Sequence, residues 1–511
     1  MLQLPPGRAV RSILCSSIFV ALAALAVAPG QVSAPVTAQE PPLIRFEASD
    51  TVRWRATLQA LQDGLPYVPG ELLVRFNPDA DPGEHARALS VLRTDVRASN
   101  VRWIGDVVHL HGLGDVDPVR AAEDLQRQPE VIYAQPNYIR PLKSRPNDPN
   151  YAQQWHFDAI DLPRAWDINP GGRDDVIVAV LDSGLSTTTA TFGFRIWNGE
   201  AFQVFGVPFA QIEDFDHARV RRGREFAFGL QWITPSGENL VFDADGHGSH
   251  VAGTIAQQTN NGIGFAGVAH ATTILPVKVC WSYWDLQLAL GAEGSRGFAP
   301  ADFNGCDDSA IVEGLRYAAD NGARVINMSL GGEPPAPALE EALEYAVSRG
   351  AFVSIAAGNE ALEGNPTSYP AAYAPDIDGV VAVGAVTRAS TRARYSNFGP
   401  YVELVAPGGD GAAQANAVWQ MAPDQDDLAF ELLSPRFDRF QSLGINGTSM
   451  AAPHVAGVAA LLYSQGITNP AAIEAALKRF ARDLGPAGRD DEYGHGVVDA
   501  RAALRGLGVV R

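Results

Sequence analysis

Residues 175–184 read DVIVAVLDSG, an apolar run rich in β-branched residues that ends in an aspartate, a serine and a glycine. Comparable runs of strand length follow along the chain, at 272–279, 323–330, 351–359, 379–386 and 402–408. Near-continuous β-branched runs indicate strands that are buried on both faces, as in a parallel sheet covered by helices. Helical stretches alternate with them, so the sequence predicts an α/β fold with a doubly wound, mostly parallel sheet.

Two long segments interrupt this alternation. Residues 185–242 and 281–305 lack a clear period and are predicted to be irregular surface insertions. The first contains the basic stretch RVRRGRE at 219–225, which is interpreted as part of a decorative loop, with a lid over a substrate as the alternative.

A smaller unit precedes the parallel sheet. Residues 68–142 read as strand, helix, a strand pair or one long strand, helix and edge strand, which is the β-α-β-β-α-β order of a ferredoxin-like α+β unit. The segment KSRPNDPN, at 143–150, then interrupts regular structure and marks a linker. The second domain is therefore expected to span 151–511, with no further module after it.

The first residues have the layout of an export signal. Arg8 and Arg11 precede the apolar run ILCSSIFVALAALAVA at 13–28, which is shorter than the roughly 20 residues of a membrane-spanning helix. We expect residues 1–38 to be a cleaved signal peptide and 39–67 to be a leader or linker, with an uncleaved anchor as the alternative. The mature protein should then be secreted, extracellular and free of the membrane.

Charge and cysteine content agree with export. The chain has 511 residues, long enough for two or three domains, and its formal net charge of −19 argues against nucleic-acid or anionic-membrane partners. Cys15 would leave with the signal peptide, so Cys280 and Cys306 remain. An even pair in an oxidising compartment is a disulfide candidate, and two buried free thiols are the alternative.

Reactive side chains stand where the predicted elements end. Asp182 and Asn359 follow strand-like runs, whereas His247 and Ser449 stand in glycine-flanked turns that open helices. Ligands of an open parallel sheet bind beyond the carboxyl ends of its strands. A carboxylate, an imidazole and a hydroxyl are the groups that nucleophilic acyl transfer requires, because the serine needs a base that the carboxylate orients. Neighbouring glycines would let a substrate backbone approach, and the helix N-terminus at Ser449 offers N–H groups to an oxyanion.

The stretches VAVLDSG, GHGSHVAGT, INMSLGG, SIAAGNE and GINGTSMAAPHVAG together resemble the subtilisin family of serine proteases, in the family's order. The resemblance covers about 150 to 505 and implies that Asp182 orients the base, His247 is the general base and acid, and Ser449 is the nucleophile. Asn359 matches the oxyanion asparagine. The segment 68–142 resembles the family's inhibitory prosegment, an intramolecular inhibitor. The resemblance also implies two backbone segments that line the substrate pocket, Ser329, Leu330, Gly331 and Ala356, Ala357, Gly358.

The expected activity is therefore that of a secreted serine endopeptidase. It would act on proteins or peptides through an acyl-enzyme, work as a monomer and arise by self-cleavage between about Arg140 and Asn147. Ser183 and Ser249 replace the family's usual threonines and keep the hydroxyl, so little effect is expected. No cofactor is expected for the chemistry.

Structural calcium is a possibility that the resemblance raises, with the metal ligands unknown. Acidic clusters lack a defined calcium-loop spacing and are interpreted as solvated surface, with Asn147 and Asp148 as the better candidate by resemblance. The clusters are Asp302 with Asp307 and Asp308, Glu213 with Asp214 and Asp216, and Asp424 with Asp426 and Asp427.

Two other functions remain as alternatives. GTSMA is close to a nucleophile elbow, so Ser449, Asp490 or Asp491, and His495 would give the chain order of an α/β-hydrolase esterase. FQSLGINGT, however, is not expected to be the strand that such an elbow needs. A secreted binding protein on an inactive scaffold is the other alternative. His250, His454 and His495 are interpreted as structural histidines.

Overall fold

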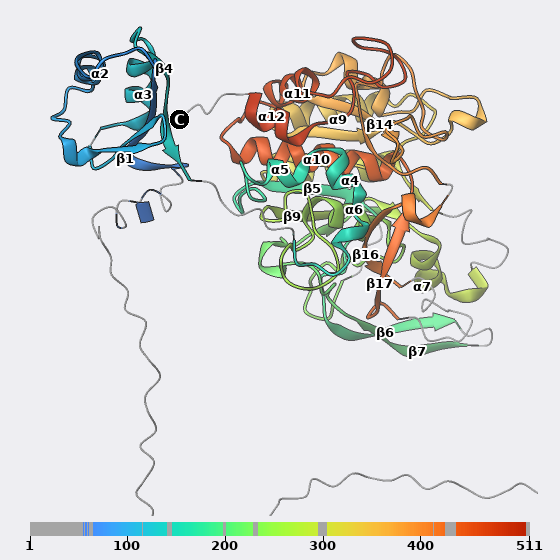
Figure 1. Ribbon diagram of the computed structural model, residues 1–511. Coiled ribbons are helices and arrows are strands. Elements are labelled where there is room, and N and C mark those ends of the chain that lie inside the picture. The colour runs from blue at the N-terminus through green and yellow to red at the C-terminus, as the bar shows by residue number, and fades with distance from the viewer. Residues whose placement is uncertain are drawn as a thin grey trace, which may run out of the picture. The chain divides into compact units, whose positions relative to one another are not determined.

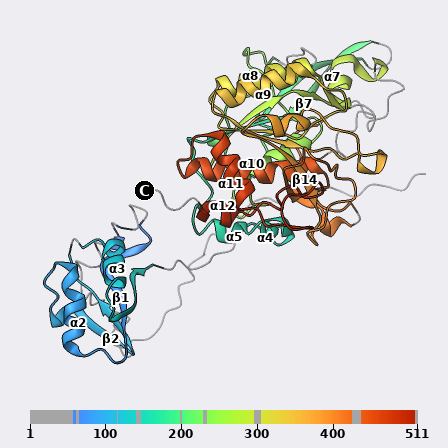
Figure 2. The ribbon, with the colours of Figure 1, turned by 90° about the horizontal axis from the view of Figure 1, so that it is seen from above.

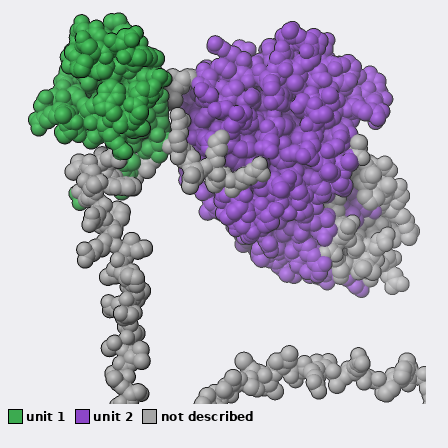
Figure 3. All heavy atoms as spheres, in the orientation of Figure 1, with its two compact units in different colours: residues 1–140 green, residues 141–511 purple. Residues whose placement is uncertain are grey.

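The chain forms two compact units, Met1–Arg140 and Pro141–Arg511, which Figure 3 distinguishes by colour. The computed structural model describes residues 55, 57, 58, 60, 65–114, 116–139, 146–197, 201–227, 233–294, 304–411, 413–424 and 436–506. The predicted signal peptide, most of the leader and most of the predicted processing segment lie outside these residues.

The first unit is a four-stranded antiparallel sheet with the strand order β2-β3-β1-β4. Leu72, Leu110 and Leu125 are fully buried in its core. The stretch 101–113, predicted as a strand pair or one long strand, forms a hairpin, and the strand predicted at the edge is β4. The elements are β1 (Tyr67–Phe76), α2 (Pro82–Leu89), β2 (Val101–Ile104), β3 (Val107–Leu110), α3 (Pro118–Gln126) and β4 (Val131–Tyr138).

The second unit is built on a seven-stranded sheet with the order β15-β14-β13-β12-β5-β9-β8, and every pairing in it is parallel. The predicted α/β class is confirmed. Each of the apolar runs from the sequence supplies one strand, and only β8 lacks such a run. The strands are β5 (Ile177–Asp182), β8 (Arg224–Glu225), β9 (Thr273–Lys278), β12 (Val325–Met328), β13 (Phe352–Ala356), β14 (Val380–Val386) and β15 (Leu404–Pro407).

Helices cover both faces of this sheet, as Figures 1 and 2 show. On one face α10 (Thr448–Ser464) packs across β12, β13, β14 and β15 beside α6 (His247–Ala256). On the other face lie α8 (Asp308–Asp320) and α9 (Pro337–Ser348). The remaining helices are α4 (Trp155–Ala159), α5 (Leu162–Ala165), α7 (Tyr283–Gly294), α11 (Pro470–Arg479) and α12 (Ala500–Gly506).

The two predicted insertions are not irregular, contrary to the sequence-based expectation. Residues 185–242 contain the hairpin of β6 (Ala190–Trp197) and β7 (Phe202–Phe209), and residues 281–305 contain α7. Aromatic residues of the hairpin pack with α7 in a cluster of their own that includes Phe209, Phe242 and Phe437. The hairpin and α7 are therefore stabilised by burying their aromatic side chains against each other, which the sequence pattern alone did not reveal.

Two short ribbons complete the unit. One pairs β16 (Val418–Pro423) with β17 (Phe440–Ile445), so FQSLGI is a strand and the expectation that it would not be one is wrong. β17 belongs to an isolated antiparallel ribbon and not to the central sheet. The other pairs β10 (Cys280–Trp281) with β11 (Gly305–Cys306). Within the part of the chain that is described, no helix has the length and apolar character needed to cross a membrane.

Candidate active site

The carboxyl ends of three neighbouring strands bring the predicted residues to one edge of the sheet. Asp182 is the last residue of β5, Ser329 follows β12 directly, and Asn359 follows shortly after β13. These strands are adjacent and parallel, so their carboxyl ends meet at the same edge. The side chain of Asp182 is almost fully buried there, and its Oδ1 accepts a 2.8 Å hydrogen bond from the Ser183 backbone N–H.

His247 is the first residue of α6 and contacts this carboxylate. Its Nδ1 lies 2.7 Å from Oδ1 of Asp182, and 27% of its side chain is exposed. Gly246 precedes the helix with φ +94°, a left-handed conformation that favours glycine. The His247 imidazole therefore contacts the buried Asp182 carboxylate on one side and is partly exposed to solvent on the other.

Two glycines allow this contact. A Cβ atom on Gly248 would lie 2.4 Å from the Gly184 carbonyl oxygen, and one on Gly184 would lie 2.5 Å from the Phe242 carbonyl oxygen. Both distances are too short for real contacts, so any larger residue would push α6 away from the end of β5. The glycines in DSG at 182–184 and in GHGS at 246–249 are thus required by the close packing of these two segments.

Asp243 also holds the end of β5 against the start of α6. This fully buried carboxylate accepts hydrogen bonds from the Ser183 hydroxyl at 2.9 Å, the Gly246 N–H at 2.8 Å and the Ser249 N–H at 2.7 Å. The Ser183 hydroxyl also accepts from the Gly248 N–H at 2.9 Å. The hydroxyl of Ser249, by contrast, is buried without a hydrogen-bond partner among the described residues. Of the two serines that depart from the family pattern, only Ser183 uses its hydroxyl here.

Ser449 lies in the first turn of α10, as the sequence predicted. Its hydroxyl donates to the Ser329 carbonyl oxygen at 3.3 Å, and the Ser329 hydroxyl donates to the Ser449 carbonyl oxygen at 2.8 Å. Among the hydrogen bonds of the described residues, none joins Ser449 to His247. In this structure Asp182 and His247 are therefore in contact, whereas the Ser449 hydroxyl is turned toward the residue that follows β12.

Asn359 reaches the same helix start. Its Oδ1 accepts from the Thr448 N–H at 2.8 Å and the Thr448 hydroxyl at 3.0 Å. These bonds occupy the carbonyl end of the amide and leave Nδ2 without a partner among the described residues. A Cβ atom on Gly447 would lie 3.6 Å from the Ser449 backbone N and 3.7 Å from Asn359 Nδ2, so both donors border the same small space. Two N–H donors around one space are suited to an oxyanion.

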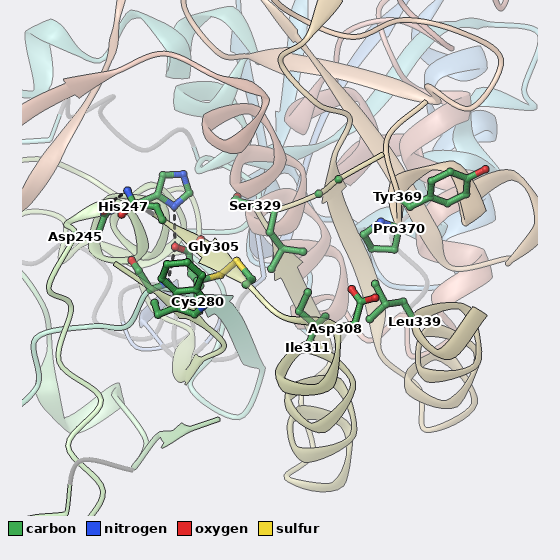
Figure 4. A pocket seen from close by; sticks show the side chains of 18 of the residues that line it. Asp245, His247, Cys280, Gly305, Asp308, Ile311, Ser329, Leu339, Tyr369 and Pro370 are labelled. Carbon is green, nitrogen blue, oxygen red and sulfur yellow. Dashed lines mark hydrogen bonds and ion pairs between the residues drawn. A yellow bond between two sulfur atoms is a disulfide. The ribbon is translucent and has the colours of Figure 1, made fainter. Parts of the chain in front are cut away.

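A cavity of about 410 Å³ runs along this edge, from Asp182 and His247 to Tyr369 and Pro370. Ser329, Leu330 and Gly331 line it, and Figure 4 shows Ser329 between His247 and Leu339. Ala356, Ala357 and Gly358 do not line this cavity, and Ala356 and Ala357 are buried. Their predicted role in substrate binding stays a prediction.

The disulfide that the sequence left open is formed, because Cys280 and Cys306 are bonded across β10 and β11. Both cysteines line the cavity, and Figure 4 shows the sulfur–sulfur bond at its wall. The disulfide joins the two ends of the insertion that contains α7. The insertion is therefore fixed to the cavity wall at both of its ends.

The electrostatics of the site favour a charged imidazole. Burial alone would lower the pKa of His247, but the charge and hydrogen bond of Asp182, with further charge from Asp245 and Asp243, raise it above its ordinary value. Burial raises the pKa of Asp245 to about 6, and the charge of Asp243 adds to the rise. Asp182 thus favours the charged form of the His247 imidazole.

Two candidates for cation ligands from separate clusters lie side by side. Asp214 is fully buried and accepts from Asn261 Nδ2 at 2.7 Å, and Asp148 accepts from the Asn260 and Asn261 N–H groups. Burial, followed by the charge of Asp148, raises the pKa of Asp214 to about 7, and among the described residues no basic side chain pairs with either carboxylate. Buried carboxylate oxygens are ligands that suit a hard cation such as Ca²⁺. The described residues contain no group of three or more His, Cys, Asp or Glu side chains that could hold a metal ion.

The described members of the other acidic clusters make local contacts. Asp307 caps α8 by accepting from the Ala310 N–H, and Asp216 accepts from the Ala218 N–H. Asp302, Asp426 and Asp427 lie outside the described residues. Asp148 and Asp214, by contrast, share a neighbour, because Asn261 donates to both of them.

The remaining histidines have structural contacts. His250 Nε2 bonds the Val418 carbonyl oxygen at 2.9 Å, and His454 bonds the Met450 carbonyl oxygen at 2.8 Å and His156 at 2.8 Å. His495 contributes its backbone N–H to the Glu403 carbonyl oxygen. No hydrogen bond among the described residues joins the imidazole of His495 to Asp490 or Asp491, so an acid–imidazole pair like that of Asp182 and His247 is not formed there.

Sequence reasoning missed Lys278 and Asp285. Both are buried next to the end of β5, and Lys278 donates to the Ser183 carbonyl oxygen at 2.6 Å. A lysine at the end of an apolar strand run was the one available signal, since lysine is almost never fully buried without a partner.

Comparison with known proteins identifies the family of this chain. Residues 173–496 match the Subtilase family, and residues 56–137 match the Fervidolysin N-terminal prodomain. The thermophilic serine proteinase of Bacillus sp. (strain AK1) is 32% identical over 430 residues, which are 84% of this chain and 86% of that protein. The extracellular protease of Xanthomonas campestris is 35% identical over 399 residues, 75% of this chain and 61% of that protein.

Solved structures show the same fold. A protease from Pseudoalteromonas arctica has a TM-score of 0.53 and 31% identity, covering 71% of this chain and 99% of its own. Fervidolysin from Fervidobacterium pennivorans has a TM-score of 0.51 at 24% identity over 86% of this chain and 61% of its own, a likeness of fold alone. The family match covers well over half of this chain, and the Bacillus relative aligns along most of it. With an N-terminal unit of the fervidolysin prodomain type, this protein belongs to the subtilase family of serine proteases.

Proposed function

We propose that this protein is a secreted serine endopeptidase that hydrolyses peptide bonds with Asp182, His247 and Ser449 and is made as a self-processing precursor. The observation that carries the proposal is the 2.7 Å contact between His247 Nδ1 and Asp182, which leaves the other ring nitrogen toward the open side of the site.

Each residue then has a chemical role. Ser449 turns its hydroxyl from Ser329 to His247, which accepts the proton as the oxygen attacks the substrate carbonyl. Asp182 holds the ring orientation and stabilises the positive charge that forms. His247 next gives the proton to the leaving amine, and the acyl group stays on Ser449. Water attacks the acyl-enzyme in the second half-reaction, again with His247 as the base.

The oxyanion of each tetrahedral intermediate needs two donors. The Ser449 backbone N–H and Asn359 Nδ2 border the space beside Gly447, which supports this role. The Thr448 bonds to Asn359 Oδ1 orient the amide before substrate arrives, so little reorganisation is needed during the reaction.

The substrate is proposed to be an extended polypeptide that lies in the cavity along Ser329, Leu330 and Gly331. The N-terminal unit, which matches a prodomain, is proposed to act as an intramolecular inhibitor that is removed by self-cleavage between about Arg140 and Asn147. Relatives named as extracellular proteases support secretion after removal of residues 1–38. The mature enzyme is proposed to act as a monomer.

Structural calcium is proposed at Asp148 and Asp214, where a cation would offset the buried negative charge. The ion has no step in the chemistry. Chelation with EGTA should lower the thermal midpoint of the wild-type chain and leave that of Asp214→Asn unchanged, whereas equal responses of the two proteins would exclude the site.

Expression of residues 39–511 as wild type, Ser449→Ala and Ser442→Ala tests the function. Ser442 is an exposed serine on nearby β17 and serves as the matched control. Wild type and Ser442→Ala should convert to a shorter band and digest casein, and Ser449→Ala should do neither. Unaided maturation and casein digestion by Ser449→Ala would refute the assignment. Cleavage of short acyl esters with casein left intact would instead favour an esterase.

A further inference from the structure

A fully buried ammonium group lies against the end of β5. Lys278 is the last residue of β9, opposite Asp182 in the strand register, and its side chain has no exposed surface. Its Nζ donates to the carbonyl oxygens of Ser183 at 2.6 Å and Phe242 at 3.2 Å, and to Asp285 Oδ2 at 3.1 Å. All three ammonium protons therefore have an acceptor.

The two carbonyls belong to the segments that carry the proposed catalytic pair. Ser183 directly follows Asp182, and Phe242 directly precedes Asp243, which holds the turn before His247. One cation thus joins the backbone on both sides of the contact between Asp182 and His247. A shift of the ammonium group would move both segments.

Asp285 fixes the position of that cation. It lies on α7, within the insertion 281–305, and is 2% exposed. The same Oδ2 that accepts from Lys278 also accepts from the Ser282 N–H at 2.9 Å and the Ser282 hydroxyl at 3.1 Å. The insertion therefore supplies a carboxylate whose own orientation is fixed by three donors.

Three carboxylates offset the buried charge of Lys278. Burial lowers the pKa of Lys278, but Asp285, Glu225 and Asp243 outweigh burial and raise it. Glu225 and Asp243 are also buried. Replacement of Asp285 by asparagine would therefore remove the fixed contact while two carboxylates still compensate the ammonium charge, so the variant is expected to fold.

We propose that Asp285 is a positioning residue for catalysis, which acts by holding Lys278 against the backbone that carries Asp182. The inference rests on the proposed function and deepens it, because it makes the insertion helix α7 a support of the active site. Asp285 and Lys278 touch neither the substrate nor the reacting atoms.

The test measures kcat and KM of a peptide substrate for Asp285→Asn, Asp285→Glu and Asp182→Asn, and for the double variant Asp182→Asn with Asp285→Asn. Each full chain is processed with a trace of wild-type enzyme, and Ser449→Ala treated alike gives the background. Asp285→Asn should lower kcat about tenfold with KM unchanged, since small misplacements of catalytic groups cost rate and not binding. Asp285→Glu keeps the carboxylate and should retain more activity.

The double variant decides whether Asp285 acts through Asp182. If it does, Asp285→Asn should cost less than about twofold once Asp182 is already lost, because the two effects are not independent. Equal losses in both backgrounds, or no loss in either, would overturn the inference. An unchanged kcat for Asp182→Asn would instead overturn the proposed function, and the inference would fall with it.

Glu474→Gln is the control for general destabilisation. Glu474 is buried and forms an ion pair with the partly buried Lys478 on α11, away from the edge of the sheet that carries the site. Its kcat should stay within about twofold of wild type, as expected for a pair with no shared partners. A tenfold loss in this variant at matched stability would show that any buried ion pair has the effect and would overturn the inference.

Discussion

The Gly248 backbone N–H donates a 2.9 Å hydrogen bond to the hydroxyl of Ser183, and this bond ties the start of α6 to the residue after Asp182. The two residues are 65 positions apart in the sequence. Because His247 directly precedes Gly248, the bond fixes the distance between the imidazole and the carboxylate. The active site thus depends on one junction between a strand end and a helix start.

Asp182→Asn should lower kcat about 10⁴-fold, the loss seen when the orienting carboxylate of a serine protease becomes an amide. Asp182 raises the pKa of His247, and His247 accepts the proton only when neutral. The acidic limb of the profile of kcat/KM against pH should therefore lie above the ordinary imidazole value of about 6.5 in the wild type and move to lower pH in the variant.

Asp320→Asn is the control for that shift. Asp320 is an exposed carboxylate that pairs with Arg349 outside the active-site cavity, so its loss should leave the acidic limb in place. A limb that stays unmoved in Asp182→Asn would contradict the electrostatic role of Asp182.

Asn359→Ala removes one of the two proposed oxyanion donors. The expected loss is about 10²–10³ in kcat with little change in KM, a magnitude that derives from subtilisin itself, a member of this family. Steady-state kinetics on a peptide substrate measure it, with the exposed Asn321→Ala as the control. If kcat remained within twofold of wild type, another group would have to supply the second hydrogen bond.

The buried histidines should make the catalytic unit less stable in acid, whereas Asp214 and Asp245, whose pKa values burial raises to about 7 and about 6, act in the opposite direction. Burial, together with the charge of His454, lowers the pKa of His156 well below 6.5, and burial lowers the pKa of His454 to about 4. Between pH 6.5 and 4 the unfolded chain binds protons at these positions and the folded chain does not, so the stability present above pH 6.5 is lost as the pH falls. Each histidine should reduce the free energy of unfolding by about 1.4 kcal/mol per pH unit.

Urea unfolding of Ser449→Ala, which should not digest itself, measures this dependence. His454→Gln in that background removes one of the two rings, so the free energy of unfolding should fall less steeply between pH 6.5 and pH 4 than in Ser449→Ala alone. Equal slopes in the two proteins would show that His454 takes up its proton in the folded state.

Much of the fold was predictable because buried parallel strands leave an unbroken apolar signal. The runs at 175–184 and 379–386 became β5 and β14 with their ends shifted by only a few residues. The two-residue strand β8 and the hairpin of β6 and β7 were not predicted. The first is too short to leave a pattern, and the hairpin is stabilised by packing with α7, which the sequence does not display.

The site likewise contains residues that the sequence predicted and residues that it did not. Asp182, His247, Asn359 and Ser449 stand in motifs whose glycines reveal them, and the structure brings them to one edge of the sheet. The contact between Lys278 and Asp285 carries no such motif, because it depends on how α7 returns over the end of β9. Side chains that support a site through burial are visible only once the tertiary structure is known.

Covalent labelling of Ser449 tests the central claim most directly. A fluorophosphonate reacts with a serine only when a neighbouring base activates the hydroxyl. Mass spectrometry of the digested, processed protein should locate a single adduct on Ser449, absent from Ser449→Ala and formed far more slowly in His247→Ala. An adduct on a different serine, or labelling that persists in Ser449→Ala, would contradict the account.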